Sequence, residues 1–289
     1  MITLHTQGRS EWVRTRDGRE LHAMVLTGPG PAAPAVVFEA GAAATRSTWA
    51  CVQPGVAAYA RAIVYDRSGL GRSAADQGGR RLDRMADDLN DLLDHFAPGP
   101  FVLVGHSAGG PIVRLAASRR PDRIAGLVLV DPTDEAAGIL FRRSFRVGER
   151  VVIAVNALAA RLGLLRHGFR WLLDAVPDDV RTDLRREAFG PGVVATQRQQ
   201  ARTFLDELGR WRRHPPDLGD IPVTVVSGAR AGDGMTTAVR AAANASHAVR
   251  AAASPRGRHV LAPASGHYVP ITDPRIVVDE IRRLAPARS

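Results

Sequence analysis

Six short runs of mainly apolar residues recur along the chain and show no regular alternation with polar positions. A strand that is apolar on both faces is typical of the centre of a parallel sheet, where helices cover each side. We therefore predict a central parallel strand at each of these runs, which span 35–38, 62–65, 101–104, 127–130, 223–226 and 259–262.

Two earlier segments, 11–16 and 20–25, flank the dipeptide Asp17-Gly18. This dipeptide adopts positive φ readily and so favours a tight turn between antiparallel strands. The sheet is therefore expected to begin with an antiparallel hairpin at its edge, which gives about eight strands in all.

Between the strand-like runs, apolar positions follow the period of a helix. The clearest pattern covers 82–96, and further helices are expected from about 108 to 119, 241 to 253 and 274 to 284. In the first of these, the side opposite the apolar stripe is expected to face solvent and carries Asp83, Asp87, Asp88 and Asp91. Because strands and helices alternate, the sequence predicts an α/β fold with a doubly wound, mostly parallel sheet flanked by helices.

The alternation stops between about 134 and 218, where only helical patterns occur, such as 151–165 and 193–208. We predict a helical insertion over 134–218 within a core formed by 1–133 and 219–289. The first pattern has an apolar side, for which packing onto the core is favoured over lining a substrate pocket, although the two are compatible. Its residues are Val151, Val152, Val155, Leu158 and Leu162.

The chain of 289 residues has a formal net charge of +10, and all of its 39 basic side chains other than histidine are arginine. The arginines are spread along the chain, without interleaved aromatic residues or the spacing of a DNA-binding motif. We therefore favour a compositional origin for the charge and expect no nucleic-acid partner. A role for the arginines at a membrane surface is the lesser alternative.

The segment Met1 to Gln7 lacks the basic start and apolar core of a leader, and no apolar run reaches the roughly 18 residues of a membrane span. The single cysteine, Cys51, can form neither an internal disulfide nor, by itself, a thiolate metal site. These features predict a cytoplasmic protein without a membrane span. They make no prediction for its oligomeric state.

Candidate chemistry begins at Gly105-His106-Ser107-Ala108-Gly109, which directly follows the strand-like run 101–104 and opens a helical pattern. This G-x-S-x-G sequence is the nucleophile elbow, in which a strained turn between strand and helix exposes the serine hydroxyl. We predict that Ser107 is a nucleophile. His106, inside the elbow, is expected to have a structural role.

A serine hydroxyl needs a base to remove its proton, and in this arrangement the base is expected after the last strand. Of the nine histidines, His267 alone follows the run 259–262 and precedes the final helix. The carboxylate that should orient its imidazole is Asp131, at the end of run 127–130, or Asp233, in the loop after run 223–226. Asp131 is favoured because it lies directly on a strand end, and Asp134 comes third.

An acyl-transfer site also needs two backbone N–H donors for the oxyanion. We expect one from Ala108, the residue after the nucleophile, and the other from Ala42, in the small-residue loop 39–44 that follows the first central strand.

With these motifs the chain resembles the α/β-hydrolase fold superfamily, particularly its capped esterase, lactonase, peptidase and carbon–carbon hydrolase members. The resemblance covers about residues 30–131 and 220–285. Besides the elbow, 65–73 is similar to the family's D-x-x-G-x-G-x-S loop and 265–267 to its base motif. A serine at the elbow argues against the mechanism of haloalkane dehalogenases and epoxide hydrolases.

Two positions depart from the family pattern. The usual His-Gly of the oxyanion loop is Ala40-Gly41 here, and the usual acid position after Gly228 holds Ala231. The second departure is a further reason to consider Asp131, a position that other members use. A loose dinucleotide fingerprint over 69–74 is discounted, because three residues separate it from the strand and no helix follows at once.

The sequence thus predicts a serine hydrolase that needs no cofactor and no metal and cleaves an ester, thioester or related acyl bond of a small, largely apolar substrate. The acyl-enzyme would form on Ser107. A ligand receptor that keeps the hydrolase pocket but turns over little is the alternative, because a complete triad is compatible with slow catalysis.

Overall fold

The structure is a computed structural model that describes residues 4–30 and 35–285; Met1 to Thr3, part of the segment in which no leader is expected, lie outside this range. Its centre is an eight-stranded sheet with the strand order β1-β2-β4-β3-β5-β6-β7-β8. The strands are β1 (Arg9–Arg14), β2 (Glu20–Leu26), β3 (Ala35–Glu39), β4 (Ala62–Tyr65), β5 (Phe101–His106), β6 (Ile124–Val130), β7 (Val223–Gly228) and β8 (Gly257–Ala262).

The first two strands form the expected hairpin, with Gly18 at φ 85° in the turn. Strand β2 also pairs antiparallel with β4, and every other pairing in the sheet is parallel. The predicted α/β class with a mostly parallel sheet of about eight strands is therefore confirmed.

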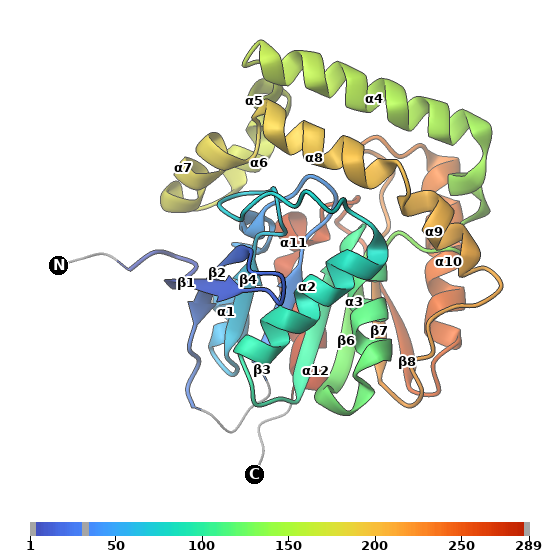
Figure 1. Cartoon of the computed structure of the whole chain (residues 1–289). Helices are drawn as coiled ribbons and strands as arrows, with labels where there is room; N and C mark the ends of the chain where they lie inside the picture. Colours follow the sequence, from blue (N-terminus) through green and yellow to red (C-terminus); the bar gives the residue numbers. More distant parts are fainter. Residues whose placement is uncertain (1–3, 31–34, 286–289) are drawn as a thin grey trace.

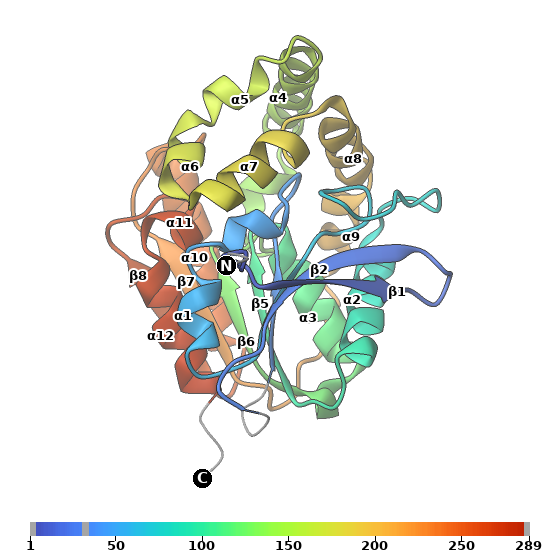
Figure 2. The same ribbon diagram turned by 90° about the vertical axis from the view of Figure 1, so that its left-hand side faces the viewer.

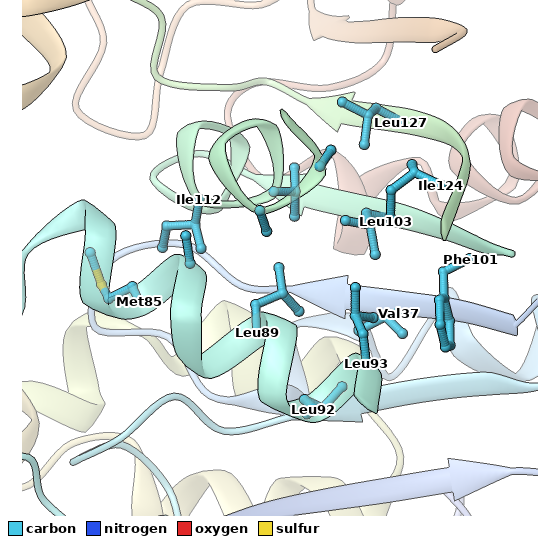
Figure 3. Packing of buried hydrophobic residues seen from close by; sticks show 14 of the residues in the cluster. Val37, Met85, Leu89, Leu92, Leu93, Phe101, Leu103, Ile112, Ile124 and Leu127 are labelled. Atoms are coloured by element: carbon cyan, nitrogen blue, oxygen red, sulfur yellow. The ribbon is translucent and has the colours of Figure 1, made fainter. Parts of the chain in front are cut away.

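Helices cover both faces of the sheet (Figures 1 and 2). Alternate strand residues point to opposite layers: Val37 and Leu103 pack with α2 and α3 (Figure 3), whereas Val36 and Val102 pack with α1 and α12. This explains why the central strands are apolar at every position. The helices of the core are α1 (Gln53–Ala57), α2 (Leu82–His95), α3 (Gly109–Arg119), α10 (Thr237–Ala252), α11 (Val269–Thr272) and α12 (Pro274–Leu284), with the 3₁₀ turns η1 (Arg46–Trp49) and η2 (Pro121–Arg123).

The expectation that the aspartates of α2 face solvent is wrong for two of them. Asp88 and Asp91 are buried and bind the guanidinium groups of Arg19 and Arg16, which come from the β1–β2 hairpin. The hairpin lies over this side of α2, so a carboxylate that looks exposed from the helix alone becomes a partner for a residue distant in the chain.

The chain between β6 and β7 contains helices and no strand. It is drawn above one end of the sheet in Figures 1 and 2, with α4 as the outermost element and α8 beneath it in Figure 1. Its elements are η3 (Gly138–Phe141), α4 (Arg143–Arg161), α5 (Leu165–Gly168), α6 (Arg170–Ala175), α7 (Asp178–Glu187), α8 (Pro191–Ala201) and α9 (Phe204–Arg210). Among the described residues, no helix has both the length and the apolar character to cross a bilayer.

The apolar side of α4 does not pack onto the core, contrary to the expectation from the sequence. Four of its five residues, Val151, Val155, Leu158 and Leu162, are 56–62% exposed, and the fifth, Val152, is 55% exposed at the rim of a pocket. The opposite side of the helix packs instead, where Ile153 and Ala160 contact Val194 of α8. The helix is apolar on two sides, and the sequence pattern did not indicate which side would be covered.

Candidate active site

Ser107 lies between β5 and α3 in a left-handed backbone conformation, with φ at 54°. The flanking glycines permit this turn: a Cβ on Gly105 would lie 2.7 Å from the carbonyl oxygen of Gly109, and one on Gly109 would lie 2.5 Å from the carbonyl oxygen of Glu39. Such distances are far below van der Waals contact. The two glycines of the elbow are therefore required by close packing, at the place where β5, α3 and the loop after β3 meet.

His267 follows β8 and brings its Nε2 to 3.0 Å from Oγ of Ser107. Its main chain is held at both polar atoms: the N–H donates to Oδ2 of Asp233 at 3.0 Å, and the carbonyl accepts from Nε2 of His106 at 2.9 Å. These bonds fix the loop from two sides, so the imidazole is aimed at the serine by the backbone that carries it.

Asp131 ends β6 with φ at 43° and places Oδ2 at 2.6 Å from Nδ1 of His267. Its other oxygen accepts the N–H of Gly228 at 3.0 Å. Burial raises the pKa of this carboxyl, but the hydrogen bond to His267 and the guanidinium of Arg240 outweigh burial and hold the pKa well below its usual range. Asp131 is thus an ionised, fixed acceptor for the imidazole.

The structure separates the candidate carboxylates by position. Asp131 reaches the imidazole ring of His267, whereas Asp233 reaches only the main-chain N–H of the same residue. Asp134 is directed elsewhere, because it pairs with Arg114 and Arg250.

Arg240 is a member of this group that the sequence did not indicate. It lies on α10, is 3% exposed, and binds Asp131 with both terminal nitrogens, Nη1 to Oδ1 at 2.5 Å and Nη2 to Oδ2 at 3.1 Å. The acid therefore faces two partners, the imidazole of His267 and the guanidinium of Arg240. Arg240 is 109 residues away in the chain, within an alanine-rich helix, and no local pattern distinguishes it from a surface arginine.

His106 is the structural residue expected from the sequence, since its ring supports the His267 carbonyl. Burial, aided by the neighbouring charge of His267, lowers the pKa of His106 to about 3. Its imidazole is consequently neutral at physiological pH. It also packs edge-on against the buried ring of Trp49.

The loop after β3 brings Ala42 to the nucleophile, where Ala42, Ser107 and Ala108 line one cavity of about 160 Å³. Arg67 holds this loop by binding the carbonyl oxygens of Ala40 and Gly41 and the carboxylate of Glu39. The loop is therefore tied to the chain after β4.

Beneath the loop, the buried carboxylate of Glu39 also accepts the hydroxyl of Tyr65. Burial raises the pKa of Glu39, although the charge of Arg67 opposes the shift. Neither Glu39 nor Arg67 was singled out from the sequence. A charged residue at the end of an apolar run was the one available signal for Glu39.

A larger cavity of about 540 Å³ adjoins Ser107 and His267 on the side of the helical insertion. Its lining is mainly apolar and aromatic, and the polar side chains besides the catalytic pair include Thr45, Thr48, Asn156, Gln197 and Asp233. The residues contributed by the insertion include Val152, Leu165, Phe169, Trp171, Leu172, Leu184, Phe189 and Val194, and the core adds Tyr268 and Ile271. A pocket of this kind fits an apolar organic molecule of modest size.

The D-x-x-G-x-G-x-S loop after β4 does not reach the serine. Asp66 is fully buried and binds His22 and Arg46. Gly71 has φ at 51°, and a Cβ there would lie 2.2 Å from the Asp66 carboxylate. The motif is therefore a support for the core, and its glycine is required by close approach to the acid.

Comparison with known proteins gives the family of this chain. The family described as alpha/beta hydrolase fold matches residues 34–165. The magnesium-chelatase 30 kDa subunit of Rhodobacter capsulatus is 32% identical over 217 residues, 74% of this chain and 74% of that protein. The chain belongs to the α/β-hydrolase fold family. The predicted resemblance to this family is thus confirmed.

Two further comparisons extend over most of this α/β hydrolase. Esterase Rv0045c of Mycobacterium tuberculosis is 29% identical over 279 residues, 90% of this chain and 85% of that protein. A solved structure, the epoxide hydrolase CorEH without ligand, superposes with a TM-score of 0.73 at 19% identity and covers 96% of this chain and 98% of that chain. Its likeness concerns the fold. The protein is an α/β-hydrolase enzyme.

Proposed function

We propose that this enzyme is a serine hydrolase that cleaves an ester, thioester or related acyl bond through an acyl-enzyme on Ser107. One observation carries the proposal: Oγ of Ser107 lies 3.0 Å from one ring nitrogen of His267, while the other ring nitrogen lies 2.6 Å from Asp131. Nucleophile, base and orienting acid are in the order that acyl transfer requires.

In the proposed mechanism, His267 removes the proton of Ser107 as Oγ attacks the acyl carbon. The N–H groups of Ala42 and Ala108 stabilise the resulting oxyanion, and each such donor typically contributes about 10² to 10³ in rate. The leaving group departs with the proton from His267. Water, deprotonated by His267, then attacks the acyl-enzyme and releases the acid and the free serine. No cofactor or metal is needed for these steps.

The proposed substrate is small and largely apolar. The cavity of about 540 Å³ over Ser107 supports this, because apolar and aromatic side chains dominate its lining. We further propose that residues 134–218 act as a cap that closes over the site, with 1–133 and 219–289 as the core. The cytoplasmic location expected from the sequence stays a prediction.

A fluorophosphonate probe tests the proposal, since it phosphonylates an activated serine and leaves ordinary hydroxyls unmodified. Wild type should be labelled at Ser107, located by mass spectrometry of the modified peptide, and Ser107→Ala should remain unlabelled. Turnover of p-nitrophenyl butyrate should fall by at least about 10³-fold in that variant. Ser144→Ala, at an exposed serine on α4, is the matched control and should behave as wild type.

Two results would contradict the proposal. One is a folded wild type that the probe does not label. The other is a Ser107→Ala variant that is labelled as fast as wild type, which would place the reactive group elsewhere.

A second candidate is a hydrolase-fold ligand receptor with little turnover. The ion pair between Arg240 and Asp131 favours it, because a guanidinium on the acid reduces the negative charge available to stabilise a protonated His267. Turnover of p-nitrophenyl butyrate measured beside thermal shift distinguishes the two. A wild type that the ester stabilises against heat but that hydrolyses it no faster than Ser107→Ala supports the receptor.

A further inference from the structure

The outer side of α4 presents a continuous apolar stripe, which we define as Val147, Val151, Val155, Leu158 and Leu162. The spacing of four, four, three and four residues places all five on one side of the helix. Their exposed fractions run from 48% to 62%. From Val147 to its last member Leu162, the residue that caps α4, the stripe extends over about 23 Å of helix.

The same helix is already packed on its inner side. Ile153 and Ala160 are buried against Val194 of α8, and Ala157 adjoins this cluster. An amphipathic helix that has met its partner normally turns a polar side to water. Here the side turned to water is apolar, and a contiguous exposed patch of this kind typically marks an interaction surface.

Positive charge accompanies the stripe. Residues 139–172 contain seven arginines and one acidic residue, Glu149, which gives a formal charge of +6 out of the +10 of the whole chain. Arg143, Arg150 and Arg161 share one flank of the stripe, are exposed, and pair with no carboxylate among the described residues. Leu164, 54% exposed, follows the helix closely in the chain, whereas Trp171 on α6, 39% exposed, packs edge-on against Tyr268 at the pocket.

These charges decide between the possible occupants of the stripe. A second copy of this chain packed antiparallel in a symmetric pair would bring one arginine flank against the other, which is unfavourable. A nucleic acid would satisfy the arginines and leave the valines and leucines uncovered. An anionic lipid surface satisfies both, because its headgroups attract arginine while its acyl boundary receives apolar side chains.

We propose that α4 docks on the surface of an anionic lipid bilayer, with the stripe at the boundary between headgroups and acyl chains and the arginines among the headgroups. This is attachment to one leaflet, and it requires no membrane-spanning segment. It stands apart from the chemistry at Ser107, since the stripe faces away from the core.

The position of the stripe also suggests what it supplies. Val152, next to Val151 in the chain, lines the 540 Å³ pocket over Ser107 together with Leu165 and Trp171. An apolar substrate taken from the bilayer would therefore have a short path to the serine. This second step rests on the proposed hydrolase function, whereas the docking itself does not.

Sedimentation with vesicles tests the docking. Wild type should bind vesicles of equal parts phosphatidylglycerol and phosphatidylcholine, bind phosphatidylcholine alone far more weakly, and dissociate as salt is raised. Val155→Asp should weaken binding at least about tenfold, because burying a valine contributes about 1.5 kcal/mol or more and an aspartate is repelled. Val249→Asp is the matched control: Val249 is 57% exposed, lies on α10 outside the stripe, and should bind as wild type does.

A second pair of variants tests the charges. Arg150→Gln with Arg161→Gln should weaken binding roughly 30-fold, at about 1 kcal/mol for each arginine near an anionic surface. The control, Arg213→Gln with Arg275→Gln, removes two exposed arginines from the turn after α9 and from α12 and should lose much less. Ser107→Ala should bind vesicles as wild type does, so a failure of docking is separable from a failure of the proposed catalysis.

Docking is overturned if wild type stays in the supernatant with the anionic vesicles, or if Val155→Asp sediments as fully as Val249→Asp. A dimer in analytical ultracentrifugation that Val155→Asp dissociates, without vesicle binding by either protein, would assign the stripe to a second copy of the chain instead.

Discussion

At the scale of single residues, the unusual feature is an acid that binds both an imidazole and a guanidinium. Oδ2 of Asp131 is hydrogen-bonded to the ring of His267, and both carboxylate oxygens accept hydrogen bonds from Arg240. The negative charge of Asp131 in turn opposes the lowering that burial causes in the pKa of His106 and of His247. The pairing fixes the orientation of the carboxylate and at the same time reduces the field that it exerts on the imidazole.

Replacing Arg240 with glutamine should therefore change both the rate and its pH dependence. We expect kcat/KM for p-nitrophenyl butyrate to fall about tenfold, because a loosened carboxylate no longer aims the imidazole. The acid limb of the kcat/KM profile should move to higher pH, since Asp131 without its guanidinium attracts the proton on His267 more strongly. Asp131→Asn should cost far more, about 10⁴-fold, through loss of the correct tautomer.

Arg250→Gln is the matched control for Arg240→Gln. Arg250 lies on the same helix and pairs with Asp134 and Glu135, away from the site. Both variants should lose stability, but only Arg240→Gln should move the pH profile. An unchanged acid limb in Arg240→Gln, beside a lower stability, would leave this arginine with a purely structural role.

Site residues could be predicted from the sequence where a local motif or a position next to a strand marked them. The elbow and the position of His267 after the last strand singled out two residues whose side chains lie 3.0 Å apart. The choice between Asp131 and Asp233 was harder, because both loops open at the same edge of the sheet. Arg240 could not be anticipated at all, since its partner is set by how α10 packs against the end of β6.

At the scale of elements, α7 is joined to the chain around the sheet by a buried charge network. Arg46, in η1, is fully buried and binds Asp66 of the core together with Asp183 and Glu187 of α7. Arg72 reaches the same two acids of α7 from the loop after β4. The network is the main charged link between α7 and the sheet.

Arg46→Gln should loosen this link. Three carboxylates would lose a buried guanidinium, and breaking such a pair typically costs about 3–5 kcal/mol. Urea unfolding should show that loss, and limited proteolysis should cut within 134–218 sooner than in wild type. Arg119→Gln breaks a largely exposed pair with Asp83 and Asp87 and should cost less than about 1 kcal/mol. Equal losses in the two variants would contradict the role assigned to Arg46.

The elements themselves were largely readable from the sequence, because parallel strands covered on both faces are apolar throughout. The pattern did not predict which face of each helix is buried and which is exposed. The stripe on α4 is exposed although it is apolar, and Asp88 is buried although it is charged. Both depend on neighbours that come from other parts of the chain.

At the scale of the whole molecule, stability should depend on buried histidines. Burial lowers the pKa of His106 to about 3, against an ordinary 6.5, and also lowers the pKa of His247. Between about pH 3 and pH 6.5 the unfolded chain binds a proton at His106 that the folded chain does not. The stabilisation is therefore complete above about pH 6.5 and is lost as pH falls, at roughly 1.4 kcal/mol per pH unit for one group.

Carboxylates such as Asp131 add to this loss only at lower pH, because their ordinary pKa values lie near 4 and folding lowers them further. The midpoint of urea unfolding should consequently decline between about pH 6 and pH 4.5, less steeply than the histidines alone would give, because the raised pKa of buried Glu39 acts in the opposite direction. His106→Gln keeps an N–H donor for the His267 carbonyl but removes one titration, so its decline should be shallower than that of wild type. His214→Gln, at an exposed histidine, should follow the wild-type slope. If the urea midpoints of His106→Gln and wild type declined in parallel with falling pH, His106 would bind a proton equally well in the folded and the unfolded chain. The acid sensitivity would then originate elsewhere in the fold.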